Sequence, residues 1–127
     1  MENKIKRDTA LINLVSDFEC RFDQGEIGYL DEKVYLQLLE YYEDEYLFEK
    51  ALEVVEFAID QYKYRSEFYL IKARLLLNLN NINDCLKTLD IVETIAPFER
   101  DISIIRVRAF AINKQFSKAH AILDELR

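Results

Sequence analysis

Glycine and proline are almost absent from this chain, whose 127 residues include 2 Gly and 1 Pro, about 2% where ordinary composition gives roughly 12%. Turns that need a positive φ or a fixed ring are therefore scarce. This scarcity argues against sandwiches and barrels, and against glycine-rich loops that hold phosphate groups. Half of the residues are hydrophobic and 32% are charged. We therefore expect one folded domain with a buried core rather than a disordered chain.

Residues that carry out catalysis or bind metal are also few. Cys20 and Cys85 lie far apart and outside any CxxC or His-paired spacing, so neither a zinc site nor a disulfide is expected. Both cysteines are expected to be reduced and buried. The single histidine, His120, is interpreted as a half-buried helix residue rather than a catalytic group. The sequence thus predicts no catalytic site, no metal and no cofactor.

The charge balance is acidic, with 17 Lys and Arg against 24 Asp and Glu and a net charge of −7. Such a charge repels the phosphate backbone, which disfavours nucleic acid as a partner. The charge is uneven, −6 over residues 31–65 and +3 over residues 100–127. We interpret these as solvated faces, with head-to-tail attraction between copies as the alternative. No signal peptide or membrane-spanning window is visible, which favours a cytoplasmic location and no membrane partner.

The apolar residues repeat with a period of 34. Seven sets of three aligned positions share this spacing: Leu36, Leu70 and Ile104; Leu39, Ala73 and Val107; Tyr42, Leu76 and Phe110; Phe48, Ile82 and Phe116; Ala51, Cys85 and Ala119; Val55, Leu89 and Leu123; Ala58, Val92 and Leu126. A fixed period of this size is typical of helical repeat proteins. Within each unit the apolar residues recur three and four apart, which predicts helices with one buried stripe.

Short polar breaks divide each unit into two helices. They lie at Asp44 and Glu45, at Asn80 and Asn81, and at residues 113–115. Asparagine tolerates the left-handed conformation that ends a helix, so it can replace the missing glycine there. Pro97 closes the second unit, because a helix ends before a proline.

These features resemble the tetratricopeptide repeat family. The small residues Ala51, Ala73 and Ala119, with Cys85 as a near-small one, stand where the two helices of a repeat touch, and Pro97 matches the closing proline. The resemblance covers about residues 32–127 and implies an all-α fold, a right-handed α-α superhelix of about three helix pairs. Departures are the absence of Trp and the larger residues Leu39 and Val107 at a slot that is usually small.

Residues 1–30 lie outside the repeat register. Their apolar residues form one stripe that ends near Gly25, which predicts a capping helix at about residues 5–24 and a connector before an N-cap at Asp31. The predicted organisation is therefore a cap and connector at 1–30, followed by three units at about 32–65, 66–99 and 100–127. Because the last unit has no following repeat, we expect either the N-terminal part of a longer repeat protein or a C-terminal face that pairs with another copy.

The resemblance also implies a concave groove lined by the first helix of each unit. The candidate groove residues, which would bind a peptide or protein segment, are Leu36, Glu40, Glu43, Leu70, Arg74, Leu77, Asn78, Ile104 and Arg108. In this prediction Leu36, Leu70 and Ile104 form an apolar rung, and the guanidinium groups of Arg74 and Arg108 hold a carboxylate of the partner. The alternative is that carboxylates on neighbouring helices, at Glu40, Glu67 or Asp101, neutralise the two arginines.

Three functions remain from these patterns. The first is a non-enzymatic module that binds a peptide or protein with acidic groups, and the second is a structural cap and spacer, or a self-associating dimer, without its own ligand. An RNA-binding repeat ranks last because the groove of the first unit is acidic. The run of carboxylates from Glu40 to Glu56 is interpreted as a solvated face, with a surface for a basic partner as its alternative. Only Arg108 fits the pattern by which chaperone adaptors of the family hold a carboxylate, so that activity is not expected here.

Overall fold

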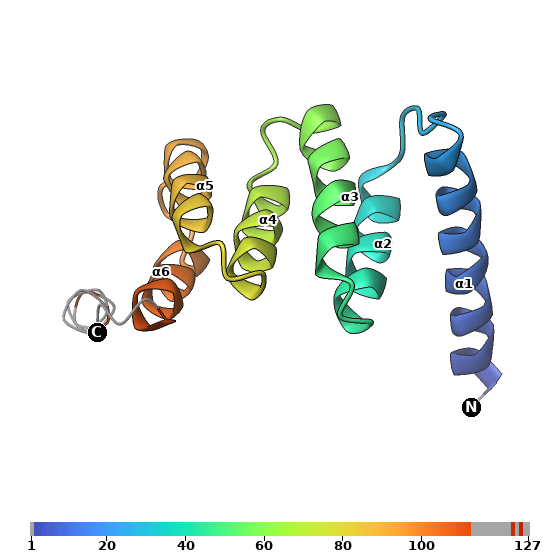
Figure 1. The fold of residues 1–127 in the computed structure, drawn as a ribbon, viewed down its shortest axis with the longest axis horizontal. Coiled ribbons are helices and arrows are strands. Elements are labelled where there is room, and N and C mark those ends of the chain that lie inside the picture. The colour runs from blue at the N-terminus through green and yellow to red at the C-terminus, as the bar shows by residue number, and fades with distance from the viewer. Residues whose placement is uncertain (1, 113–122, 124, 126–127) are drawn as a thin grey trace. The chain divides into compact units, whose positions relative to one another are not determined.

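The structure, a computed structural model, describes residues 2–112, 123 and 125. Between residues 2 and 112 it contains six α-helices and no strand: α1 (Glu2–Asp23), α2 (Glu32–Asp44), α3 (Phe48–Gln61), α4 (Ser66–Asn78), α5 (Ile82–Ile95) and α6 (Asp101–Ile112) (Figure 1). The sequence predicted these helices, including the first one and the break at Gly25. The predicted second helix of the third unit, with Phe116, Ala119, His120 and Leu126, lies outside the described residues.

The chain forms two compact units, Met1–Leu47 and Phe48–Arg127, which we call unit 1 and unit 2. Unit 1 contains α1 and α2, and unit 2 contains α3 to α6. This division falls inside the first predicted repeat rather than at residue 30. The predicted cap and three repeats follow the period of the sequence, whereas the two units are defined by how compactly the chain packs. The predicted division stays a prediction.

In unit 1, α1 packs on α2. Val15 and Phe18 of α1 are buried, and so is Tyr42 of α2. The Tyr42 hydroxyl donates a hydrogen bond of 3.0 Å to Oε1 of Glu19. Burial and this carboxylate raise the pKa of the Tyr42 hydroxyl well above its ordinary value. Tyr42 therefore joins the two helices of unit 1 through its hydroxyl.

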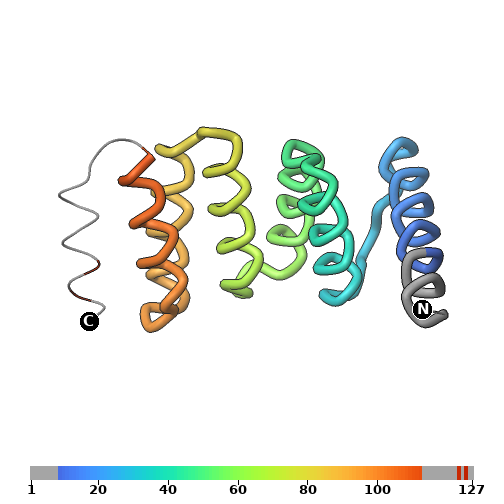
Figure 2. Tube along the Cα trace, turned by 90° about the horizontal axis from the view of Figure 1, so that it is seen from below, coloured from blue at the N-terminus to red at the C-terminus, as the bar shows by residue number. Residues whose placement is uncertain are grey.

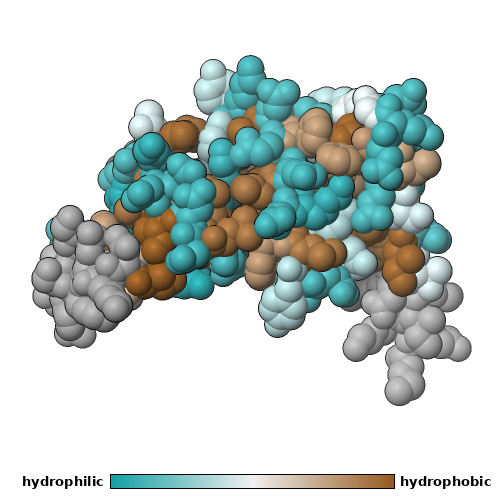
Figure 3. Space-filling view, viewed as in Figure 1, coloured by the Kyte–Doolittle hydropathy of each residue, from teal (hydrophilic) through white to brown (hydrophobic). Residues whose placement is uncertain are grey.

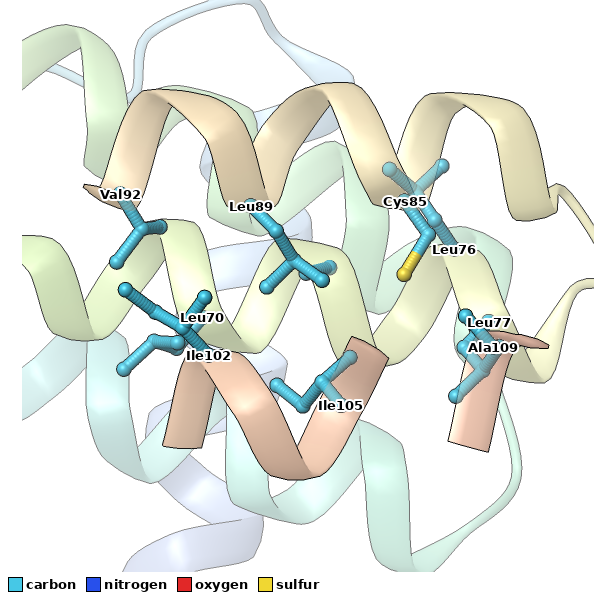
Figure 4. Close-up of a cluster of buried hydrophobic side chains, with 10 residues drawn as sticks. Leu70, Leu76, Leu77, Cys85, Leu89, Val92, Ile102, Ile105 and Ala109 are labelled. Atoms are coloured by element: carbon cyan, nitrogen blue, oxygen red, sulfur yellow. The ribbon is translucent and has the colours of Figure 1, made fainter. Parts of the chain in front are cut away.

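In unit 2, each helix packs against the next along the chain, and α4 also contacts α6. Consecutive helices of this unit run in alternating directions (Figure 2). Figure 4 shows the core that α4, α5 and α6 share, with Leu89 and Cys85 of α5 facing Ile102 and Ile105 of α6. Ala73 lies in the same core and is fully buried, as predicted for a small residue at a helix contact. Cys20, in contrast, is exposed, so the prediction that both cysteines are buried was wrong for this one.

Three helices end in the same hydrogen-bonded turn. After α2, the N–H of Tyr46 donates to the carbonyl of Glu43 and the N–H of Leu47 to that of Tyr42; after α4, Asn80 donates to Leu77 and Asn81 to Leu76. The end of α1 forms the same pair of bonds around Gly25. The central residues Gly25, Tyr46 and Asn80 have positive φ values of 72°, 58° and 62°, as the Schellman motif requires. The left-handed Asn80 was predicted, whereas the left-handed Tyr46 was not.

The period of 34 also appears in the ion pairs between helices of unit 2. Nζ of Lys72 on α4 lies 2.7 Å from Oε1 of Glu56 on α3. Thirty-four residues on, Nη2 of Arg106 on α6 lies 2.8 Å from Oδ1 of Asp90 on α5. The α3–α4 and α5–α6 contacts are therefore equivalent in charge pattern as well as in position.

Candidate binding surface

The strongest candidate surface of unit 2 is formed by α4 and α6, which contact each other. Each helix has a stripe of residues at equivalent repeat positions. In α4 the stripe comprises positions 67, 70, 74 and 78, and in α6 it comprises positions 101, 104, 108 and 112. Asn78, Ile104 and Arg108 are exposed, and Arg74 is half-buried. Figure 3 shows apolar side chains among hydrophilic ones over the region of α6, where Ile104 and Ile112 are 44% and 49% exposed.

Two of the candidate groove residues are largely buried in the core, although Leu70 also lines a pocket with Glu67 and Asp101. Leu70 and Leu77 are 7% and 3% exposed and pack in the cluster of α4, α5 and α6 (Figure 4). Leu70 therefore does not contribute an exposed apolar side chain to the predicted groove, because α4 packs against α3, α5 and α6 and buries most of its apolar residues. Among the candidate groove residues of α4 and α6, Ile104 is the only apolar residue that is exposed.

The remaining groove candidates lie on α2 in unit 1. Glu40 is exposed, whereas Leu36 and Glu43 are half-buried. The structure thus places three candidates on α2, four on α4 and two on α6, each on the helix that the sequence predicted. A single groove that includes both units stays a prediction.

Arg108 and Arg106 differ sharply although they are two residues apart. Nη2 of Arg106 lies 2.8 Å from Asp90 and 2.7 Å from Glu93, and the guanidinium lowers the pKa of the Glu93 carboxyl. Arg108 is exposed and forms no ion pair with any carboxylate of the described residues. Glu40, Glu67 and Asp101 therefore form no ion pair with Arg108, whereas the same alternative for Arg74 stays a prediction.

The buried thiol of Cys85 lies within electrostatic reach of Arg108. Burial raises the pKa of Cys85 from 9.0 to about 11, and the positive charge of Arg108 partly opposes this rise. A thiol with this pKa is protonated at neutral pH and is a poor nucleophile. Cys85 is thus a core residue at the base of the α4–α6 surface rather than a reactive group.

Unit 1 has a separate hollow between α1 and α2. Its lining residues are Ala10, Leu11 and Leu14 of α1, and Gln37, Glu40, Tyr41 and Asp44 of α2. The sequence predicted Glu40 as a groove residue but did not reveal Leu11 and Leu14 as the opposite wall of this hollow. Their three-residue spacing showed an apolar stripe on the first helix, and only the packing of α1 on α2 shows which part of that stripe stays open.

Within the described residues, no group of three or more His, Cys, Asp or Glu side chains is arranged to bind a metal ion. None of the helices built from those residues has the length and apolar character needed to cross a bilayer.

No protein-family model matches the chain, and no curated protein matches it significantly. Among solved structures, the crystal structure of PcrH from Pseudomonas aeruginosa is similar, with a TM-score of 0.53 and 15% sequence identity. The match covers 86% of this chain and 92% of the PcrH chain. At this identity the likeness bears on the fold alone. Together with the six helices of residues 2–112, it confirms the all-α helical-repeat fold expected from the sequence.

Proposed function

We propose that this protein is a non-enzymatic protein-binding module of the tetratricopeptide kind. The helical-repeat fold supports this proposal, and so does the period of 34, which recurs in the turn hydrogen bonds around Tyr46 and Asn80. Helical repeats present elongated surfaces for other proteins and need no bound cofactor to do so. The module would act by binding alone, without chemistry of its own.

The observation that carries the proposal is the exposed guanidinium of Arg108 beside the exposed side chain of Ile104, one helical turn away. Arg74 occupies the equivalent position on α4. Arginine binds carboxylates through two parallel hydrogen bonds, and an adjacent apolar residue adds area that a partner can bury. A partner segment with an acidic group next to an apolar residue fits this surface.

The test is affinity capture from the native host, followed by a titration with the captured segment. The wild-type chain is compared with the Arg74→Glu/Arg108→Glu double variant. Reversal of two charges at an interface centre is expected to weaken binding by about tenfold or more, because opposite charges then become like charges. Arg100→Glu serves as a single-charge control, since Arg100 is exposed like Arg108 but lies before α6 and outside the stripe.

A partner that is lost by the double variant and retained by Arg100→Glu supports the proposed surface. Equal capture by all three proteins would reject Arg74 and Arg108 as binding residues. Equal loss in both variants would indicate general charge attraction instead of a local site. Circular dichroism of each variant checks that the helices remain intact.

A second candidate function is structural, with the chain acting as a cap or as one half of a dimer. Exposed apolar residues near the C-terminal end favour it, because Ile112 and Leu123 are 49% and 40% exposed. Sedimentation velocity over a range of concentrations tests this function. Self-association that Ile112→Asp abolishes would support the dimer, and a monomer at all concentrations would reject the dimer.

A further inference from the structure

A hollow of about 590 Å³ lies between α1 and α2 of unit 1. Its size falls within the range of roughly 300–1,000 Å³ in which proteins bind ligands or side chains. Leu11 and Leu14 of α1 are half-buried, so part of their apolar surface remains accessible from the hollow. The hollow is therefore a candidate docking surface that is separate from the arginines of unit 2.

The two walls of the hollow differ in chemistry. The α1 wall consists of Ala10, Leu11 and Leu14, whereas the α2 wall carries the carboxylates of Glu40 and Asp44 with Gln37 and Tyr41. Glu40 and Asp44 are four residues apart on one helix face, and both are exposed. A ligand for this hollow needs apolar groups on one side and positive charge on the other.

The position of these carboxylates is unfavourable for α2 itself. Glu40 lies near the C-terminal end of the helix, Asp44 is its last residue, and the last turn contains no basic residue. The C-terminus of a helix carries partial negative charge, and two carboxylates spaced four residues apart also repel each other. Among the side chains of residues 9–112, none forms an ion pair with Glu40 or Asp44. A cation brought to this end of α2 would relieve both effects.

The repeat does not require acids at these positions. The residues equivalent to Glu40 are Arg74 and Arg108, and the residue equivalent to Asp44 on α4 is Asn78. Unit 1 as a whole contains five Lys and Arg against twelve Asp and Glu, whereas unit 2 contains twelve of each. The whole net charge of −7 therefore belongs to the unit that holds the hollow.

We propose that the hollow between α1 and α2 binds a basic amphipathic segment of a protein partner. Leucine-like side chains of the segment would contact Leu11 and Leu14, and its Lys or Arg side chains would pair with Glu40 and Asp44. Complementary charge selects this occupant, since a polyanion such as nucleic acid is repelled by the unit. Helices with an apolar face and basic flanks are a common form of such segments.

The test uses a synthetic helical peptide with a leucine stripe flanked by lysines, labelled for fluorescence anisotropy. We expect saturable binding to the full chain that weakens as salt is raised, because exposed charges are screened. The Glu40→Gln/Asp44→Asn variant should bind the peptide about tenfold more weakly, as expected for the loss of two favourable charge pairs. Leu14→Ser should also weaken binding, because it removes apolar surface from the other wall.

Two controls separate local docking from general attraction. Asp23→Asn/Glu26→Gln removes the same number of charges from exposed positions of unit 1 outside the hollow, and it should leave binding within about twofold of wild type. A peptide of the same composition with its leucines dispersed should bind more weakly than the ordered peptide. Equal weakening by both double variants, or equal binding of both peptides, would overturn the proposal.

Other outcomes also decide the question. Absence of saturable binding at low salt would overturn the proposal. Self-association that only Glu40→Gln/Asp44→Asn disrupts would also overturn it, since the occupant would then be a second copy. None of these results depends on Arg74 or Arg108, so the failure of this site and the failure of the proposed arginine surface are distinguishable. The Glu40→Gln/Asp44→Asn variant should remain folded, because both residues are exposed.

Discussion

The C-terminal halves of α2 and α4 have the same backbone and opposite side-chain chemistry. Both helices end in the same turn, with Tyr46 in unit 1 at the position of Asn80 in unit 2. The charged position one turn before each end is Glu40 in α2 and Arg74 in α4. The period of 34 therefore maintains helix ends and buried stripes, while exposed positions of the same register differ. Each unit can then offer a different surface to a partner.

The largest effects are expected when the core residue type of one helix is placed at the equivalent position of the other. Leu39 of α2 and Ala73 of α4 share one repeat position, and both are almost fully buried. Leu39→Ala should lower the free energy of unfolding by about 2–5 kcal/mol, because it leaves a cavity. Ala73→Leu should lower it by about 1–3 kcal/mol, because the extra atoms overpack the contacts of α4.

Urea unfolding followed by circular dichroism measures both effects. If Ala73→Leu were neutral, the two positions would be interchangeable, and the small residue at 73 would not be a packing requirement. A neutral Leu39→Ala would mean that the burial of Leu39 contributes little to stability.

The second prediction concerns the left-handed residues that end α1 and α2. A residue with a Cβ is strained in this conformation, so Tyr46→Gly should raise the free energy of unfolding by about 0.5–1 kcal/mol. Gly25→Ala should lower it by about 1 kcal/mol, and strain alone would be the cause, since a Cβ at Gly25 meets nothing within 4 Å.

Thermal unfolding of the two variants gives opposite shifts if this account is right. Asn80→Gly provides the control in unit 2, where asparagine already tolerates the conformation and the change should be only a few tenths of a kcal/mol. Destabilisation by Tyr46→Gly would show that the ring of Tyr46 stabilises the turn by more than its backbone strain costs.

The third prediction converts the end of α2 to the chemistry of α4. Glu40→Arg/Asp44→Asn places the residue types of positions 74 and 78 at the equivalent positions of unit 1. The free energy of unfolding should rise by about 0.5–1 kcal/mol, because positive charge is favourable at a helix C-terminus. Binding of the basic peptide should be lost in the same variant.

The reverse exchange, Arg74→Glu/Asn78→Asp, should lower stability by a similar amount. Measurement at low and high salt distinguishes the cause, since both effects should shrink as salt screens the charges. Equal stability of all these proteins would show that the acidic end of α2 has no energetic cost.

The sequence predicted most of this fold because its signals are local or periodic. The apolar spacing located the helices from α1 to α6, and Gly25, Asn80 and Pro97 located three of the breaks. It did not predict the left-handed Tyr46, because a bulky residue is rarely chosen there and only the tertiary structure can impose it. Leu70 and Leu77 were assigned to the groove from the family resemblance, which could not show that contacts of α4 with α3, α5 and α6 bury them.

The candidate site was less predictable than the fold. The register placed Arg74 and Arg108 on equivalent helices, but burial decided which of their neighbours remain open. The hollow of unit 1 depends on which part of the stripe of α1 faces α2. Residues 1–30 lie outside the period, so no repeat position indicated that contact. The hydrogen bond between Tyr42 and Glu19 could not be predicted from the sequence for the same reason.

The last prediction compares the two equivalent ion pairs of unit 2 and has the smallest expected effect. Arg106→Gln should lower the free energy of unfolding by up to about 1 kcal/mol, and Lys72→Gln by about half of that or less, because Arg106 pairs with two carboxylates and Lys72 with one. Asp90, Glu93 and Glu56 are all more than half exposed, so solvent reduces each contribution.

The lowered pKa of Glu93 means that the contribution of the Arg106–Glu93 pair to stability is present above the ordinary carboxyl pKa. That contribution is lost as the pH falls through the lowered value. The difference between wild type and Arg106→Gln should therefore shrink in acid, as urea unfolding at neutral and acidic pH would measure, and a difference that stayed constant would show that Arg106 acts through packing of its aliphatic stem rather than through charge.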